Sequence, residues 1–145
     1  MTQELFDTIA QKIQDKIDYL QGLILDLRNS NSETKSSMGD KYETSREMMQ
    51  QEITRIQNQM NEFLIQQEAF HKILIKDSDV IINGSYIETS MGNFCISCSL
   101  GEVTFNSKKI FVLSSQTPLA KVLIGKSVND TFEMNGKSFK INLVN

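Results

Sequence analysis

The sequence predicts an α+β protein, with an N-terminal antiparallel coiled-coil helical hairpin followed by a β-rich domain that contains one short helix. Three observations predict this. In the first part of the chain, apolar residues recur every three or four positions, as on amphipathic helices. In the second part, short β-prone runs are separated by Gly or Asn, as in a sheet. A Thr-Pro pair ahead of an apolar run marks one helix among these strands.

The first helix is predicted from Leu5 to about Arg28. Its apolar stripe consists of Leu5, Ile9, Ile13, Ile17, Leu20, Ile24 and Leu27. Gln, Asp and Lys fill the other faces, which is typical of a helix with one buried side. The segment from Asn29 to Ser37 is polar and has no apolar face. We therefore expect the chain to reverse there, or the helix to fray on its approach to the reversal.

The second helix has the three-four spacing of a coiled-coil seam, interrupted once by a polar residue. The seam positions are Met49, Ile53, Ile56, Met60, Phe63, Gln67, Phe70 and Leu74. Two such stripes can bury their apolar faces against each other or against another chain. The antiparallel hairpin is the simpler solution, and pairing of residues 49–70 with a second copy is the alternative. A helix of about 30 residues would be about 45 Å long.

The second part of the chain predicts an antiparallel sheet. The β-prone runs are 80–82, 86–89, 94–100, 109–113, 131–134 and 138–144. Thr117 and Pro118 predict an N-cap and a first helical position, and Gly125 ends that helix. Asn135-Gly136 predicts a tight hairpin between the last two strands. We place the helical arm in residues 1–76 and the β-rich domain in residues 77–145.

The charge balance argues against direct binding of nucleic acid. The chain has 15 Lys and Arg against 18 Asp and Glu, a formal net charge of −3. Sequence-independent binding to DNA or RNA needs a basic excess, which is absent here. No run approaches the roughly 20 apolar residues that span a bilayer. We therefore expect a cytoplasmic protein without membrane association.

Cys95 and Cys98 form a C-x-x-C motif, which occurs in zinc and redox sites. Zinc normally takes four ligands, and the only histidine, His71, is far away in sequence. A redox C-x-x-C normally opens a helix, whereas residues 94–100 alternate like a strand, which would put the two thiols on opposite faces. The prediction is a pair of reduced structural thiols.

Two segments carry a family resemblance. Residues 115–126, with Asn129-Asp130 and the terminal hairpin after them, resemble the C-terminal domain of bacterial Gre transcript-cleavage factors, which has a Ser-Pro-hydrophobic-Ala, Leu-hydrophobic-Gly-Lys and Asp series. The run from Gly39 to Glu43 is similar to the Gly-Asp-x-x-Glu tip of the same family, again ahead of a charged second helix. The order and spacing of both segments agree across nearly the whole chain.

The resemblance implies an FKBP-like C-terminal domain that docks at the secondary channel of RNA polymerase, and an arm that enters the channel. It also implies that Asp40 and Glu43 act in trans, helping to hold a catalytic Mg²⁺ so that the polymerase cleaves backtracked RNA. The expected partners are RNA polymerase directly and nascent RNA indirectly, with no direct DNA contact. The protein would be a monomeric accessory factor, not an enzyme, with no cofactor of its own.

The chemistry of the tip is consistent with this role. Mg²⁺ prefers oxygen ligands and is often held by one or two protein carboxylates together with waters and phosphates. On a helix, Asp40 and Glu43 would share one face. The alternative is structural: Asp40 as an N-cap and Glu43 at the third helical position form a capping box. Both can hold at once.

Two departures from the family pattern leave an alternative function open beside cleavage. Thr44 stands where the family usually has Asn, and the basic residues Lys41 and Arg46 flank the acids. Such a protein could bind the secondary channel as a regulator without supporting cleavage. A third hypothesis, peptidyl-prolyl isomerisation, rests on FKBP analogy alone. It would need an aromatic-lined apolar pocket, whereas most aromatic residues beyond residue 78 are expected in the core.

Overall fold

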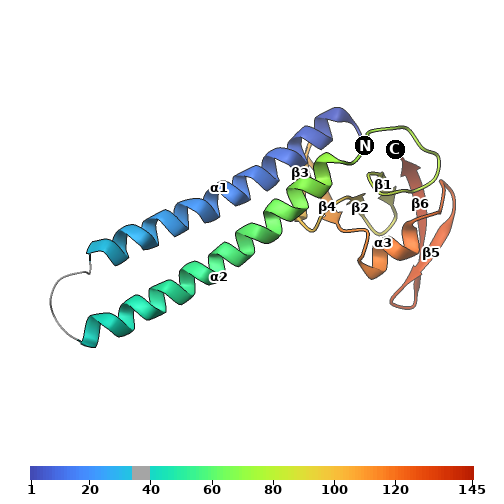
Figure 1. Ribbon diagram of the computed structural model, residues 1–145. Helices are drawn as coiled ribbons and strands as arrows, with labels where there is room; N and C mark the ends of the chain where they lie inside the picture. The colour runs from blue at the N-terminus through green and yellow to red at the C-terminus, as the bar shows by residue number, and fades with distance from the viewer. Residues whose placement is uncertain (34–39) are drawn as a thin grey trace. The chain divides into compact units, whose positions relative to one another are not determined.

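The computed structural model of the chain describes residues 1–33 and 40–145, except the side chains of residues 31–33 and 40–42. Two long helices, α1 (Gln3–Glu33) and α2 (Asp40–His71), are followed by six strands and the short helix α3 (Pro118–Leu123) (Figure 1). The predicted fold class, a helical hairpin and then a β-rich part with one short helix, is confirmed. No helix in the described ranges is long and apolar enough to cross a membrane.

The chain divides into two compact units. One unit is Lys12–Gln67, and the other combines Met1–Gln11 with Glu68–Asn145. The first, called the helical unit below, contains most of both long helices. The second, called the β-rich unit, contains the sheet, α3 and the segments where α1 begins and α2 ends. The domain boundary between residues 76 and 77 stays a prediction.

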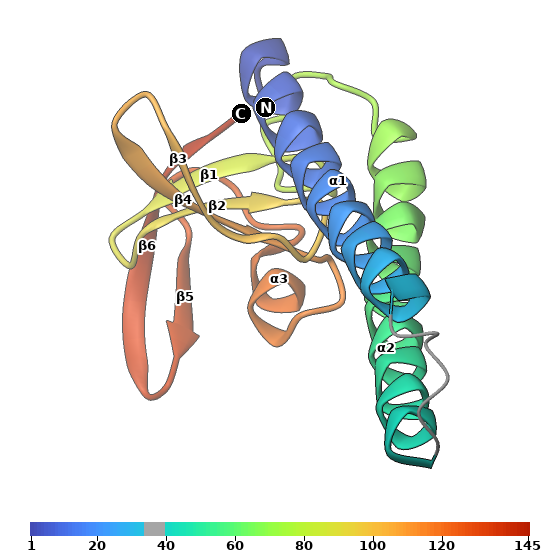
Figure 2. The ribbon, with the colours of Figure 1, turned by 90° about the vertical axis from the view of Figure 1, so that its left-hand side faces the viewer.

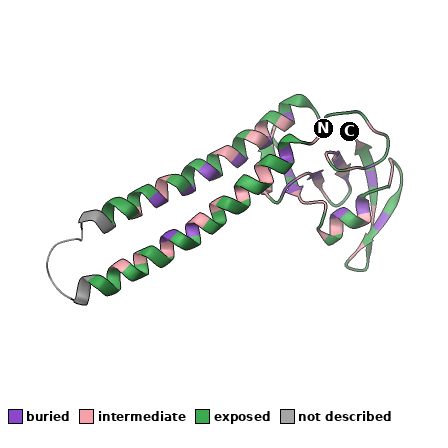
Figure 3. Ribbon diagram, in the orientation of Figure 1, coloured by how far each residue is buried: buried purple, intermediate pink, exposed green. Residues whose placement is uncertain are grey.

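The long helices pack through the apolar stripes that the spacing predicts (Figure 3). In the unit Lys12–Gln67, a buried cluster joins Leu20 and Ile24 of α1 to Ile53 and Ile56 of α2. The polar interruption of the seam is also paired, since Gln67 Nε2 donates to Gln14 Oε1 at 2.7 Å. In the other unit, the rings of Phe6 and Phe70 stack with centroids 4.4 Å apart. Low numbers on α1 meet high numbers on α2, so the helices are antiparallel.

Helix α1 continues into the polar segment where a reversal or fraying was expected, and α2 ends before the predicted seam position Leu74. Helix α1 continues through Asn29 to Glu33, because Asn and Ser weaken a helix by only a few tenths of a kcal/mol and no Gly or Pro interrupts it there. Helix α2 ends at His71, where the amides of Lys72 and Ile73 bond to carbonyls three residues back and tighten the last turn. Leu74, assigned to the seam, is therefore outside the helix and 79% exposed.

The sheet has the strand order β3-β4-β2-β1-β6-β5. The strands are β1 (Tyr86–Thr89), β2 (Asn93–Ile96), β3 (Gly101–Phe105), β4 (Lys108–Leu113), β5 (Thr131–Met134) and β6 (Lys137–Val144). The predicted all-antiparallel sheet is wrong at one place, because β2 and β4 are parallel. An alternating run cannot reveal its pairing direction, since both directions share the same period of two.

Two strand boundaries also differ from the prediction. The run predicted as a strand from residue 94 to 100 ends at Ile96, and the chain then bends and starts β3 at Gly101. Gly101, where β3 begins, takes a positive φ of 83°, which a residue without Cβ adopts readily. Residues 80–82 form no strand, and Val80 makes only an isolated bridge with Ser127.

The two turn signals of the C-terminal part are confirmed. Thr117 caps α3, accepting from the amide of Ala120 at 3.2 Å, and Pro118 is the first helical residue. Asn135 and Gly136 have φ of 54° and 76°, the left-handed values that a two-residue hairpin requires. The hairpin of β5 and β6 therefore has the geometry that its sequence favours.

Strand β2 lies inside the sheet, between β4 and β1 (Figure 2), and its last three residues are all buried. Its Phe94 and Ile96 lie in one cluster with Ala120 and Leu123 of α3. The remaining buried members of that cluster are Ile81, Ile87, Phe132 and Ile141. Cys95 alternates with Phe94 and Ile96 along the strand, so it belongs to the other face, and it is also fully buried.

Candidate functional site

The acidic pair predicted at the tip lies at the start of α2. Asp40 is the first helical residue, and Glu43 follows in the first turn with its side chain exposed to solvent. Positions three residues apart on a helix lie on one face. The side chain of Asp40 lies outside the described part of the chain, as does all of residues 34–39, so the roles of Asp40 and Glu43 as catalytic or metal ligands stay predictions.

The residues after Glu43 define the chemical surroundings of the tip. Thr44 is exposed, and Glu47, which sequence reasoning passed over, is exposed one turn further on. Glu47 could have been found from its spacing of four residues after Glu43, which places both side chains on one side of the helix. Arg46 is half-buried, and its Nε has no hydrogen-bond partner among the described side chains. The side chain of Lys41 is not described.

A metal site at the tip would need more ligands than the predicted acidic pair supplies. Within the described residues, no group of three or more His, Cys, Asp or Glu side chains is placed to hold an ion. Mg²⁺ needs near-octahedral oxygen coordination, of which a carboxylate pair supplies one or two ligands. A carboxylate pair would therefore need further ligands from elsewhere to hold Mg²⁺, and metal binding at the tip stays a prediction.

A second polar constellation lines a cavity of about 320 Å³ in the β-rich unit. Glu88 Oε1 accepts from the hydroxyl of Tyr86 at 2.8 Å and from Lys108 Nζ at 2.9 Å. Hydrogen bonds from Lys108 and then Tyr86 lower the pKa of the Glu88 carboxyl. Burial raises the pKa of the Tyr86 hydroxyl most, and the hydrogen bond to Glu88 raises it further. The three side chains form a fixed cross-strand group, because both donors reach the same carboxylate oxygen.

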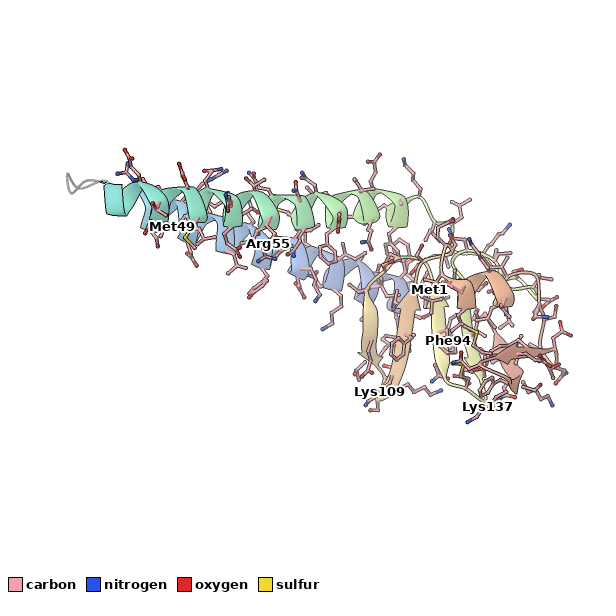
Figure 4. The ribbon with its side chains drawn as sticks, turned by 90° about the horizontal axis from the view of Figure 1, so that it is seen from below. Met1, Met49, Arg55, Phe94, Lys109 and Lys137 are labelled. Atoms are coloured by element: carbon pink, nitrogen blue, oxygen red, sulfur yellow. The ribbon has the colours of Figure 1, made fainter. Side chains whose placement is uncertain are left out.

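A hollow of about 410 Å³ in the same unit is partly aromatic. Phe94 and Phe111 line it with Met91, Leu119 and Lys109. Figure 4 labels Phe94 and Lys109 among the side chains of this unit. Phe111 is 50% exposed, so the expectation that the aromatic residues lie mostly in the core is wrong at this position. It is paired with Phe94 in the parallel register of β2 and β4.

The two cysteines are free and buried. Burial raises the pKa of both thiols to about 11, so both are protonated at neutral pH. This agrees with reduced thiols that have no nucleophilic role. The argument for opposite faces was wrong in its premise, because the strand ends at Ile96 and Cys98 lies in the following bend.

Comparisons with known proteins give similarity at the level of structure. No protein-family model matches the chain, and no curated protein matches it significantly. A crystal structure of the GreA factor homolog Gfh1 of Thermus thermophilus is 13% identical, covers 94% of both chains and has a TM-score of 0.39. A structure of the transcription factor Gfh1 is 15% identical, covers 93% of this chain and 92% of that chain, and has a TM-score of 0.38. Thermus aquaticus Gfh1 is 18% identical, covers 94% of this chain and 95% of that chain, and has a TM-score of 0.36. Sequence identities and TM-scores this low assign no activity to this chain.

Proposed function

We propose that this chain is a transcription elongation factor that binds RNA polymerase in its secondary channel and stimulates cleavage of backtracked RNA by the polymerase. The observation that carries the proposal is a Gly-Asp-x-x-Glu motif that leads into the second of two long packed helices, followed in the same chain by the block of residues 115–126. Either motif alone would be weak. Their joint order and spacing resemble the Gre family along nearly the whole chain.

The helices supply reach and placement. At about 1.5 Å per residue, a helix of the length of α2 is about 48 Å long. The acids are in its first turn, where carboxylates also interact favourably with the helix dipole. That interaction stabilises the helix start, so the structural and functional roles of Asp40 and Glu43 coexist.

The role of the acids is to complete a metal site on the polymerase. Asp40 and Glu43 would each offer carboxylate oxygens from one helix face, and the exposure of Glu43 leaves it free to be approached. A bound Mg²⁺ would supply Lewis-acid activation of a water and charge stabilisation at the scissile phosphate. The chain would bring no cofactor of its own and would not be an enzyme by itself. RNA polymerase is the direct partner, and RNA is reached only through it.

The alternative is a secondary-channel regulator that binds polymerase without supporting cleavage. The observation that favours it is the neighbourhood of Glu43. Thr44, exposed, stands where the resembled family usually has Asn, and the half-buried Arg46 lies three residues after Glu43 on the helix. A cation near the carboxylates competes with a metal ion for them. Placement of the metal would then fail although docking succeeds.

The experiment separates binding from cleavage. Backtracked polymerase complexes with labelled RNA are incubated with this protein and Mg²⁺, and binding is followed in parallel by co-sedimentation. We expect RNA shortening with the unmodified chain and at least a roughly tenfold slower reaction with Asp40→Asn or Glu43→Gln, as is usual when metal coordination is disturbed.

The matched control is Glu47→Gln, an exposed acid one turn away on the same helix, which should retain cleavage. All variants should bind polymerase as the unmodified chain does. Binding without RNA shortening by the unmodified chain would establish the regulator instead. Absence of binding would reject both functions.

A further inference from the structure

Three turns of the β-rich unit contain an exposed asparagine followed by a small residue. The backbone nitrogen after an asparagine can attack the side-chain carbonyl carbon, which closes a five-membered ring and releases ammonia. The reaction is favoured by a neighbour with little steric bulk and by a nitrogen that is free to move. The three pairs are Asn83-Gly84 ahead of β1, Asn106-Ser107 between β3 and β4, and Asn135-Gly136 between β5 and β6.

The fold holds the turn at Asn83 closed to this reaction. The amide of Gly84 donates to the carbonyl of Ile96 at 2.7 Å, so the attacking nitrogen is engaged in a bond to another segment. Gly84 is also tightly packed, because a Cβ built there would lie 2.7 Å from Cγ2 of Ile73. Ring closure at Asn83 therefore needs a local opening that breaks these contacts first.

The other two turns have similar φ values but differ at the second residue. Asn106 and Ser107 take φ of 49° and 63°. Asn135 and Gly136 take φ of 54° and 76°. Ser107 carries a Cβ beside the attacking nitrogen, whereas Gly136 has none, and a Cβ built there would meet nothing within 4 Å. Among the described residues, the amide of Gly136 makes no hydrogen bond. Of the three pairs, only the one at Asn135 therefore combines a glycine neighbour with a free amide.

We propose that Asn135 is a site of spontaneous deamidation, with water as the only co-reactant. The nitrogen of Gly136 forms a bond to Cγ of Asn135, the bond from Cγ to Nδ2 breaks, and Nδ2 leaves as ammonia with the proton of the Gly136 amide. Water then opens the ring at either of its two carbonyl carbons, which leaves aspartate or isoaspartate at this position. No electron is transferred. The formal net charge of −3 becomes one unit more negative.

Isoaspartate changes the backbone of the hairpin as well as its charge. The chain then runs through the side-chain carbon, so the loop between β5 and β6 gains one backbone atom. Loop length and turn type fix the register of a hairpin, in which Met134 lies opposite Lys137. Strand β5 is at the edge of the sheet, and its Phe132 is a buried member of the cluster that includes residues of α3. We therefore expect β5 to loosen when isoaspartate forms.

The test follows the full-length protein during storage in mildly alkaline buffer. An isoaspartyl methyltransferase is the probe for isoaspartate, and peptide mapping with fragmentation assigns each converted position. We expect conversion at Asn135, with conversion at Asn83 at least about five times slower because one hydrogen bond must break first. Asn106 should also be slower, because of the Cβ of Ser107. No conversion at Asn135, or an equal rate at Asn83 or Asn106, would overturn the proposal.

Unfolding separates protection by the structure from an effect of the local sequence. In guanidinium chloride, Asn83 should convert as fast as Asn135, because both asparagines are followed by glycine. Asn106 should stay slower, because Ser107 keeps its Cβ in the unfolded chain. A difference between Asn83 and Asn135 that persists after unfolding would reject the protective role of the Gly84 hydrogen bond.

Asn135→Asp is the control for the structural consequence. It adds the charge without the extra backbone atom, and Asp-Gly also favours this kind of turn. Hydrogen exchange of the β5 amides should therefore stay as in the unmodified protein. Deamidated protein isolated by anion exchange should lose protection at β5. Equal protection in the two samples would reject the loosening of β5.

Discussion

The helical unit Lys12–Gln67 and the β-rich unit bury their apolar residues in different ways. In the helical unit, each helix contributes one stripe, and the buried positions follow from spacing alone. In the β-rich unit, neighbours come from distant positions, as when Ile87 of β1 pairs with Val144 of β6. The comparison teaches that local periodicity determines the first kind of packing and that long-range pairing determines the second.

The largest expected effect on stability comes from truncating one buried isoleucine to alanine in each unit. Ile96→Ala should lower the free energy of unfolding by about 3–5 kcal/mol, and Ile53→Ala by about 2–3 kcal/mol. Ile96 is fully buried among strands and α3, so its cavity cannot collapse. The two-helix seam around Ile53, which is 2% exposed, can relax. Urea unfolding followed by circular dichroism measures both, and an equal or reversed order would break the comparison.

The next effect compares one substitution, Thr→Ala, in the two units. Thr117→Ala removes the cap of α3 and should cost about 1 kcal/mol. Thr54→Ala, in the middle of α2, removes only a bond from the hydroxyl to the carbonyl of Gln50. It should be neutral or stabilise by a few tenths of a kcal/mol, because Ala is the better helix former. Thermal unfolding of both variants tests this, and a loss at Thr54 equal to that at Thr117 would contradict it.

The polar pair of the seam should make a smaller contribution. A double-mutant cycle with Gln14→Ala and Gln67→Ala should give a coupling energy of about 0.5–1 kcal/mol, the net worth of one partly buried hydrogen bond. The control cycle is Gln3 with Asp7, an exposed bond within α1 that should couple by less than about 0.5 kcal/mol. Equal coupling in the two cycles would show that the seam bond adds nothing beyond a surface pair.

The smallest expected effect is the pH-dependent contribution of Glu88 to the stability of the β-rich unit. Bonds from Lys108 and Tyr86 lower the pKa of Glu88 in the folded state, so this stabilisation is complete above the ordinary pKa of about 4.5. It is lost as the pH falls through the lowered value. Glu88→Gln should therefore cost at most about 1 kcal/mol at pH 7 and progressively less below pH 4.5. The pH dependence of urea midpoints measures this, and a loss that persists at low pH would assign the effect to packing.

Sequence reasoning predicts the helical unit better than the sheet. The stripe from Leu5 to Leu27 predicts the buried face of α1, because helical neighbours are three or four residues apart. It does not predict where the helix ends, since the polar residues after Arg28 permit helix and coil almost equally. In the sheet, Thr117 and Asn135-Gly136 are local signals and are confirmed.

The errors in the sheet have two physical origins. The parallel pairing of β2 with β4 has no signature in either strand, because the partner lies outside the window that determines strand character. Strand β3 is missed because the turn that joins it to β4 uses Asn106 and Ser107 in place of Asn-Gly. Both take positive φ, of 49° and 63°, which is rare without glycine. For the candidate site, the positions of Asp40 and Glu43 follow from the motif, whereas the contact of Lys108 with Glu88 depends entirely on tertiary packing.

The parallel pairing also gives the sheet an order of assembly. The hairpin of β3 and β4 closes over two residues, whereas β2 reaches β4 only across the whole of β3. Closing a short loop costs less entropy than closing a long one. We therefore expect the β3–β4 hairpin to form before β2 docks on it, and the β1–β6 pairing to come last. Asn106→Gly should accelerate folding while leaving the unfolding rate nearly unchanged, so this turn would control the folding rate of the β-rich unit.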